Sequence, residues 1–170
     1  MNDIILIALP EEAPNLVKLP NVFLTGVGKV NAAITAARVL ERLRPTRIFN
    51  FGTAGGITVH RGLHKCTRFV QRDLDVTLYN ANPIINHGAG GLTLSTGDNF
   101  VTDPTTITAD LVDMEGYAIA AAVEKYNTEF HCYKYISDSA DETASEKSQQ
   151  NIHKGEPFYM DILKQYGVNV

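Results

Sequence analysis

Polar side chains that could do chemistry stand directly after predicted strands at four points of the sequence: Glu12, Thr53, Asp98 and Ser137-Asp138. Glu115 adds a carboxylate at the start of a predicted buried helix, where the helix dipole favours a negative charge. In open α/β sheets, ligands bind beyond the carboxyl ends of the strands, so these groups are expected to share one cleft. One ionised carboxylate can activate water while a protonated one donates to a leaving group. The shared position therefore favours acid–base hydrolysis, although each carboxylate taken alone is better explained as a cap or a surface charge.

Other chemical motifs in the sequence are incomplete. The segment 26–29 is only a fragment of a phosphate-binding loop. His60 and His64 stand four residues apart, but Gly62 between them disfavours a rigid helical metal pair, even with Cys66 nearby. No serine-hydrolase nucleophile motif is present. No cluster of lysines or arginines joins the acids, so an anionic substrate group is poorly provided for. With these motifs incomplete, the sequence predicts no metal and no cofactor.

Apolar runs that alternate with helical patterns predict the elements that position these groups. The expected strands are 4–9, 22–25, 47–51, 64–70, 91–96 and 130–136. The expected helices are 30–44, 114–126 and 157–166, and the polar segment 138–148 is expected to be a loop. This alternation predicts an α/β fold, as a single three-layer domain over residues 1–170 with a central, mostly parallel (mixed) sheet flanked by helices.

Composition and charge exclude several classes of protein. The chain has 170 residues, 44% of them hydrophobic, which is enough for one domain with its own core. A formal net charge of -4 and the lack of a basic stripe argue against a nucleic-acid partner. No apolar run is long enough to span a membrane, and the first residues lack the pattern of a signal peptide. We therefore expect a cytoplasmic protein with no membrane partner, whose two cysteines are buried, reduced thiols.

Six blocks of sequence, taken together, resemble the 5′-methylthioadenosine/S-adenosylhomocysteine nucleosidases of the purine nucleoside phosphorylase superfamily. The blocks are residues 26–33, 50–56, 73–77, 95–101, 113–118 and 136–141, and they occur in the order of the family. Each block is weakly specific, but the set spans most of the chain. The resemblance implies the phosphorylase/hydrolase-like fold and the hydrolysis of a purine nucleoside that carries a 5′ thioether, releasing adenine. It also implies a role in nucleoside metabolism such as methionine salvage.

The resemblance also implies the two catalytic residues. Glu12 stands where the family has the carboxylate that activates water, and Asp138 matches the acid that protonates purine N7. Ser137 would support Asp138. Thr53 stands where the family commonly has serine, and Lys134 replaces an arginine common in bacterial members, which keeps the charge but not the bidentate fork.

Four further residues would hold the substrate, together with Thr53, Lys134 and Ser137. Glu115 matches the carboxylate that accepts the ribose hydroxyls, and Met114 packs against the sugar. Phe100 would stack on the purine while the backbone of Val101 reads its edge.

The chain is shorter than the family between about residues 78 and 90, a region that helps to form the 5′ pocket and subunit contacts in relatives. A homodimer is still the expected assembly. The alternatives are a purine nucleoside phosphorylase and a non-catalytic nucleoside-binding module. Phosphorolysis needs a cationic phosphate site, whereas the first loop here is Pro10-Glu11-Glu12 and the second cationic position is Asn50, so hydrolysis is favoured.

Overall fold

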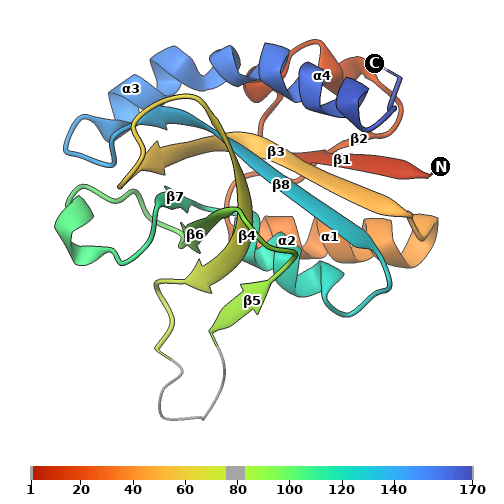
Figure 1. The fold of residues 1–170 in the computed structure, drawn as a ribbon, viewed down its shortest axis with the longest axis horizontal. Coiled ribbons are helices and arrows are strands. Elements are labelled where there is room, and N and C mark those ends of the chain that lie inside the picture. Colours follow the sequence, from red (N-terminus) through yellow and green to blue (C-terminus); the bar gives the residue numbers. More distant parts are fainter. Residues whose placement is uncertain (1, 76–82, 170) are drawn as a thin grey trace.

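Helices cover both sides of a central sheet in the computed structural model, which describes residues 2–75 and 83–169 (Figure 1). The strands are β1 (Asp3–Ile7), β2 (Val22–Leu24), β3 (Arg47–Gly56), β4 (Leu63–Gln71), β5 (Ile84–Asn86), β6 (Leu92–Thr96), β7 (Leu111–Asp113) and β8 (Glu129–Asp138). The helices are α1 (Lys29–Leu43), α2 (Gly116–Val123), α3 (Ala144–Asn151) and α4 (Glu156–Gln165). The predicted α/β class, with a mixed sheet flanked by helices, is confirmed.

The sheet closes on itself, whereas the sequence suggested an open one. β2, β1, β3 and β8 pair in parallel, and so do β4, β6 and β7. Two antiparallel contacts, β4 with β8 and β3 with β7, join these two groups. The strands β3, β8, β4, β6 and β7 therefore form a closed ring, and β1 and β2 extend it outward from β3.

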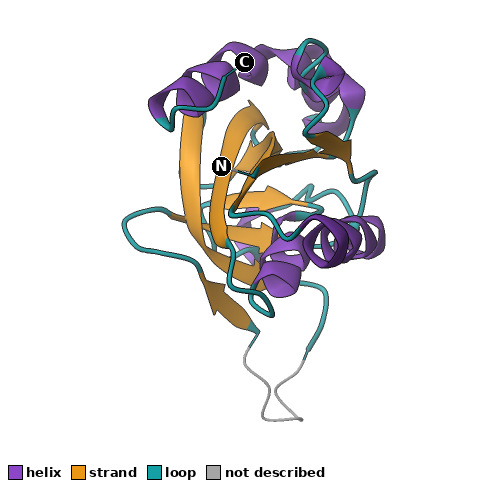
Figure 2. Cartoon of the chain, turned by 90° about the vertical axis from the view of Figure 1, so that its right-hand side faces the viewer, coloured by secondary structure: helices purple, strands orange, loops and turns teal. Residues whose placement is uncertain are grey.

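Alternate side chains of β1 pack into two different core clusters, one on each face of the sheet. Ile4 and Leu6 of β1 belong to the core cluster that includes the buried faces of α1 and α2. Ile5 and Ile7 point the other way, into a second cluster that includes Tyr159 of α4. Figure 2 shows the two helical layers on opposite sides of the strands. Burial on both faces explains why this strand is a continuous apolar run rather than an alternating one.

Three elements were not predicted from the sequence. The strands β5 and β7 have three residues each, and the helix α3 occupies part of the segment expected to be a loop. The predicted shortening at about 78–90 falls partly on residues 76–82, which lie outside the described residues. Across residues 2–75 and 83–169, no helix has the length and apolar character needed to cross a membrane.

Candidate active site

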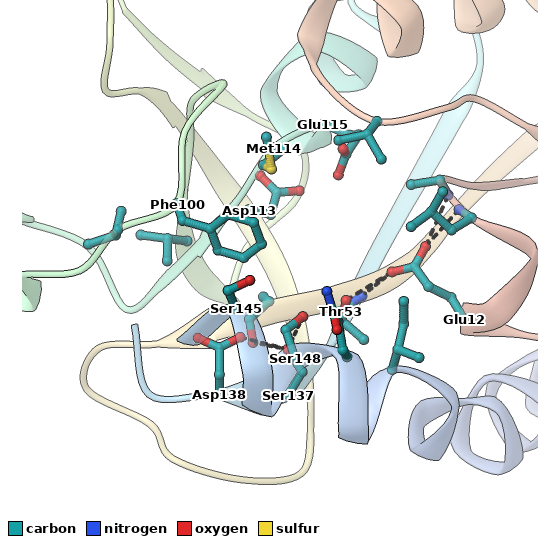
Figure 3. Close-up of a pocket in the computed structure, with 18 of the residues that line it drawn as sticks. Glu12, Thr53, Phe100, Asp113, Met114, Glu115, Ser137, Asp138, Ser145 and Ser148 are labelled. Carbon is teal, nitrogen blue, oxygen red and sulfur yellow. Dashed lines mark hydrogen bonds between the residues drawn. The ribbon is translucent and has the colours of Figure 1, made fainter. Parts of the chain in front are cut away.

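A pocket of about 310 Å³ opens where several strands end (Figure 3). Its volume is at the lower end of the range typical of small-molecule sites. Eight of the nine residues predicted for the site line it: Glu12, Thr53, Phe100, Val101, Met114, Glu115, Ser137 and Asp138 do so, while Lys134 does not. Residues from five different segments of the sequence therefore meet at one cavity.

Glu12 ends a short 3-10 helix, Pro10–Glu12, that turns the chain back over the end of β1. Its Oε2 accepts hydrogen bonds from the backbone N–H groups of Ala8 and Leu9, both at 3.1 Å. Its Oε1 accepts from the backbone N–H of Thr53 at 2.7 Å and from Thr53 Oγ1 at 3.0 Å. The side chain is buried, and all four contacts come from donors, so both carboxylate oxygens are held in fixed positions.

Gly52 lets Glu12 approach the sheet closely. A Cβ atom at this position would lie 3.1 Å from Glu12 Oε1 and 3.1 Å from Lys134 Nζ. The carboxylate and the ammonium group thus lie near the same point of the β3 backbone, although Lys134 is outside the pocket wall. Tyr159 donates from its hydroxyl to the Gly52 carbonyl oxygen at 2.9 Å and fixes this part of β3 from the α4 side.

Asp138 is the last residue of β8, and its carboxyl group is buried at the opposite end of the pocket from Glu12 (Figure 3). Its Oδ2 accepts a hydrogen bond from Ser137 Oγ at 2.8 Å, and its Oδ1 accepts from the backbone N–H of Ala140 at 2.9 Å. Gly55 of β3 leaves the space that Oδ1 occupies, because a Cβ there would be only 2.8 Å away. The two contacts fix the orientation of the carboxyl group.

Glu115 immediately precedes α2 and faces the same cavity. Its Oε1 accepts a hydrogen bond from the backbone N–H of Gly28 at 2.9 Å, just before α1 begins. Burial, followed by the negative charge of Asp113, raises the pKa of Glu115 to about 7, against the opposing effects of Lys134 and the Gly28 N–H. Its proton occupancy therefore changes near neutral pH.

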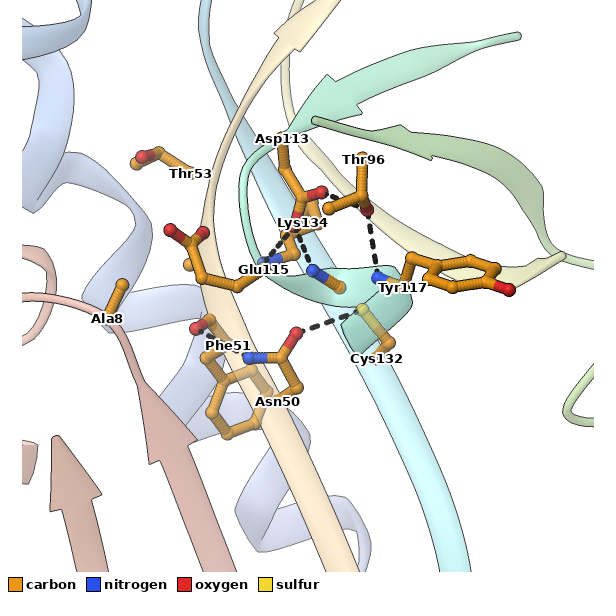
Figure 4. Close-up of polar contacts among 12 residues, drawn as sticks. Ala8, Asn50, Phe51, Thr53, Thr96, Asp113, Glu115, Tyr117, Cys132 and Lys134 are labelled. Carbon is orange, nitrogen blue, oxygen red and sulfur yellow. Dashed lines mark hydrogen bonds and ion pairs between the residues drawn. The ribbon is translucent and has the colours of Figure 1, made fainter. Parts of the chain in front are cut away.

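Lys134 is held behind the pocket by Asp113 (Figure 4). Its Nζ lies 3.0 Å from Asp113 Oδ2, and both side chains are almost fully buried. Asp113 also accepts from Thr96 Oγ1 at 2.6 Å and from the backbone N–H of Gly116 at 2.8 Å. Burial alone would lower the pKa of Lys134, but the neighbouring carboxylate of Asp113 holds it above its ordinary value. The structure therefore gives Lys134 an ion-pair partner in place of the substrate contact expected from the sequence.

Phe100, Val101 and Met114 form the wall that faces Thr53 and Asp138. Phe100 lines the cavity and is about half exposed. Asp98, which the strand-end pattern also selected, instead accepts from the backbone N–H of Lys29 at 2.8 Å and caps the start of α1.

Sequence comparison connects this geometry with known proteins. A sequence model of the phosphorylase superfamily matches residues 16–87. The 5′-methylthioadenosine/S-adenosylhomocysteine nucleosidase of Bacillus cytotoxicus is 28% identical over 185 residues, covering 83% of this chain and 79% of that protein. The nucleosidase of the same name from Bacillus licheniformis is 27% identical and covers 82% of this chain and 76% of that protein. The resemblance to this nucleosidase family is confirmed.

Solved structures share the fold of the chain. The nucleosidase of Streptococcus pneumoniae in complex with 8-aminoadenine superimposes with a TM-score of 0.84 at 21% identity, covering 96% of this chain and 97% of that one. A futalosine hydrolase mutant of Helicobacter pylori gives a TM-score of 0.85 at 18% identity, with coverage of 96% and 97%.

Several lining residues were not found from the sequence. Arg72 and Asp113 lie within or beside segments that the nucleosidase blocks cover, so those blocks carried a signal for them. Ser145, Ser148 and Gln149 come from α3, whose polar sequence resembles a loop and carried none. Within residues 2–75 and 83–169, no group of three or more histidine, cysteine or acidic side chains is arranged to hold a metal ion.

Proposed function

We propose that the protein hydrolyses the N-glycosidic bond of a purine nucleoside, 5′-methylthioadenosine or S-adenosylhomocysteine, giving free adenine and the 5-substituted ribose. The observation that carries the proposal is the placement of two buried carboxyl groups, Glu12 and Asp138, at opposite ends of one pocket. The nucleosidases that match most of this chain act, by their names, on these two nucleosides.

In the proposed reaction, protonated Asp138 donates its proton to purine N7. The N-glycosidic electron pair then leaves with the base, and positive charge develops on the ribose. Water attacks the anomeric carbon from the Glu12 side, with Glu12 orienting the water and receiving its proton. The donors around Glu12 hold its carboxylate in place, and Ser137 does the same for Asp138. Glu115 would accept the ribose hydroxyls, while Phe100 and Val101 hold the base.

Water is favoured over phosphate as the nucleophile. Among the described residues that line the pocket, Arg72 is the only lysine or arginine, and its terminal N–H groups are taken by backbone carbonyls. A like-charge contact between phosphate and Glu12 at ~4 Å would cost about 4 kcal/mol at an effective dielectric constant near 20. That penalty is equivalent to roughly a thousandfold loss of phosphate affinity.

The test is incubation with 5′-methylthioadenosine followed by chromatography. We expect free adenine and free sugar at the same rate with and without phosphate, and no sugar 1-phosphate. Futalosine belongs in the same substrate panel, because a futalosine hydrolase shares the fold. Binding without turnover would support the nucleoside-binding module, and phosphate-dependent turnover would support a phosphorylase.

The assembly, location and chain length belong to the same proposal. We infer a homodimer in the cytoplasm, acting in nucleoside metabolism such as methionine salvage, with residues 1–170 forming one shortened domain. The match to the Bacillus cytotoxicus nucleosidase runs over 185 positions, more than the 170 residues of this chain, so it contains gaps in this chain. Light scattering at working concentration tests the dimer, and a monomeric mass with full activity would remove it.

A further inference from the structure

Arg72 occupies an unusual place at the end of β4. It lines the pocket, yet its guanidinium group has no carboxylate within ion-pair distance among the described residues. Its terminal nitrogens donate instead to four backbone carbonyls. Nη1 donates to Ser95 at 2.7 Å and to Asp113 at 2.9 Å, and Nη2 donates to Gly97 at 3.0 Å and to Asn99.

These four carbonyls belong to the ends of two other strands and to the loop that follows one of them. Ser95 is in β6, and Gly97 and Asn99 lie in the segment between β6 and Phe100. Asp113 ends β7, directly before Met114 and Glu115. Since β4, β6 and β7 run parallel, one side chain joins their carboxyl ends at the edge where the pocket opens.

The guanidinium group of Arg72 packs closely against the backbone that it holds. A Cβ atom on Gly97 would lie 2.8 Å from Arg72 Nε and 2.8 Å from its Cζ, so the guanidinium rests directly against the Gly97 backbone. Two backbone hydrogen bonds reinforce the same junction: the Arg72 N–H donates to the Thr96 carbonyl at 3.0 Å, and the Gly97 N–H donates to the Asp113 carbonyl at 3.1 Å. The neighbouring Asp73 also takes part, because its Oδ2 accepts a hydrogen bond from the backbone N–H of Asp98 at 2.9 Å.

Direct recognition of an anionic ligand by Arg72 is disfavoured by the same contacts. All four N–H bonds of its terminal nitrogens point at carbonyl oxygens, and its Nε is buried. A lysine has three donors on a single nitrogen and cannot span carbonyls that lie on separate segments. The guanidinium fork is therefore suited to holding backbone in place.

We propose that Arg72 is the positioning residue of the substrate-binding wall: it fixes the segment 97–101, which presents Phe100 and Val101 to the base, and the start of the segment 114–115, which presents Met114 and Glu115 to the sugar. The proposal rests on the proposed function for the identity of the ligand. Its structural part, the fixing of these two segments, does not depend on it.

The experiment compares the wild type with Arg72→Met and Arg72→Lys. Arg68→Met is the matched control, because Arg68 is an exposed arginine on the same strand, four residues away. Hydrogen exchange of the backbone amides reports on the two segments, and calorimetric titration with adenine reports on the base site. Steady-state kinetics with 5′-methylthioadenosine separates KM from kcat.

In Arg72→Met we expect faster exchange confined to residues 97–101 and 114–115. Adenine binding should be weaker by about tenfold or more, since small displacements of positioning groups have effects of this size or larger. KM should rise more than kcat falls. For Arg72→Lys, the exchange rates, the adenine affinity and KM should lie between those of the wild type and those of Arg72→Met. Arg68→Met should match the wild type in all three. If Arg72→Met does not fold, the same pattern is required of Arg72→Lys.

Wild-type exchange in both segments together with wild-type adenine affinity in the Arg72 variants would overturn the proposal. A lower melting temperature with unchanged adenine affinity would also overturn it, because that result describes a residue that only stabilises the fold. If the wild type neither binds adenine nor cleaves the nucleoside, the proposed function fails, and the exchange pattern alone decides the role of Arg72.

Discussion

Replacing Glu115 with glutamine should change how the stability of the protein depends on pH. The pKa of Glu115 is raised from an ordinary value of 4.5 to about 7, first by burial and then by Asp113. Between these two values the unfolded chain loses the proton of Glu115 while the folded protein keeps it. Stability from this group is therefore complete below about pH 4.5, falls as the pH rises to about 7, and is constant above that. The total loss corresponds to about 3 kcal/mol in the free energy of unfolding.

Glu115→Gln removes the titration but keeps an oxygen that can accept from the Gly28 N–H. We expect the variant to gain stability relative to the wild type by about 3 kcal/mol between pH 5 and pH 8. Urea unfolding of both proteins at several pH values measures this difference, with Glu11→Gln as the exposed control. A difference between variant and wild type that does not change with pH would refute the reasoning. Turnover should fall and KM should rise in the same variant, because the ribose contact is weakened.

Four further substitutions test the site and its support. Asp138→Asn keeps the shape but not the transferable proton, and should lower kcat by about 10²–10⁴-fold with the melting temperature retained. Glu12→Gln should lose activity on a similar scale and also lower the melting temperature, because an amide N–H₂ must face backbone N–H donors on either side. Lys134→Met leaves Asp113 buried without its cation and should cost about 3–5 kcal/mol in urea unfolding; wild-type stability would show that the pair is not needed. Gly56→Ala should prevent folding, measured as loss of soluble protein, because its Cβ would lie 1.8 Å from a backbone carbonyl oxygen.

The strands that are buried on both faces could be predicted from their apolar runs. The ends of β1 and β8 were expected within two residues of where they lie, and those of α1 within one. The strand β3 was expected to end at Phe51, where the glycine-rich segment 52–56 begins. It continues through Gly55 and Gly56, where the absence of a Cβ makes room for the Asp138 carboxyl group and for a turn of backbone.

The positions of Lys134 and of α3 could not be predicted, for physical reasons. A lysine between two tyrosines in a strand can face either side, and its burial depends on Asp113, which comes from a three-residue strand too short to recognise. The polar α3 has little apolar periodicity, and its helical state depends on packing against β8 that has no local signal. The roles of Glu12, Asp138 and the other lining residues stay predictions that the variants above test.

Closure of the ring of strands links the completion of the fold to the completion of the site. β8 pairs in parallel with β3 and antiparallel with β4, and both of these strands precede it in the sequence by more than 50 residues. Without β8, the edges of β3 and β4 that face each other across the ring have no partner strand. On a ribosome that adds roughly 5–20 residues per second, the ring stays open until residue 138 has emerged. Asp138 is the last residue of β8, so the chain acquires its proposed proton donor in the same step that closes the ring. Pulsed hydrogen exchange during refolding should accordingly show the amides of β3, β4 and β8 becoming protected together, at the rate at which activity returns.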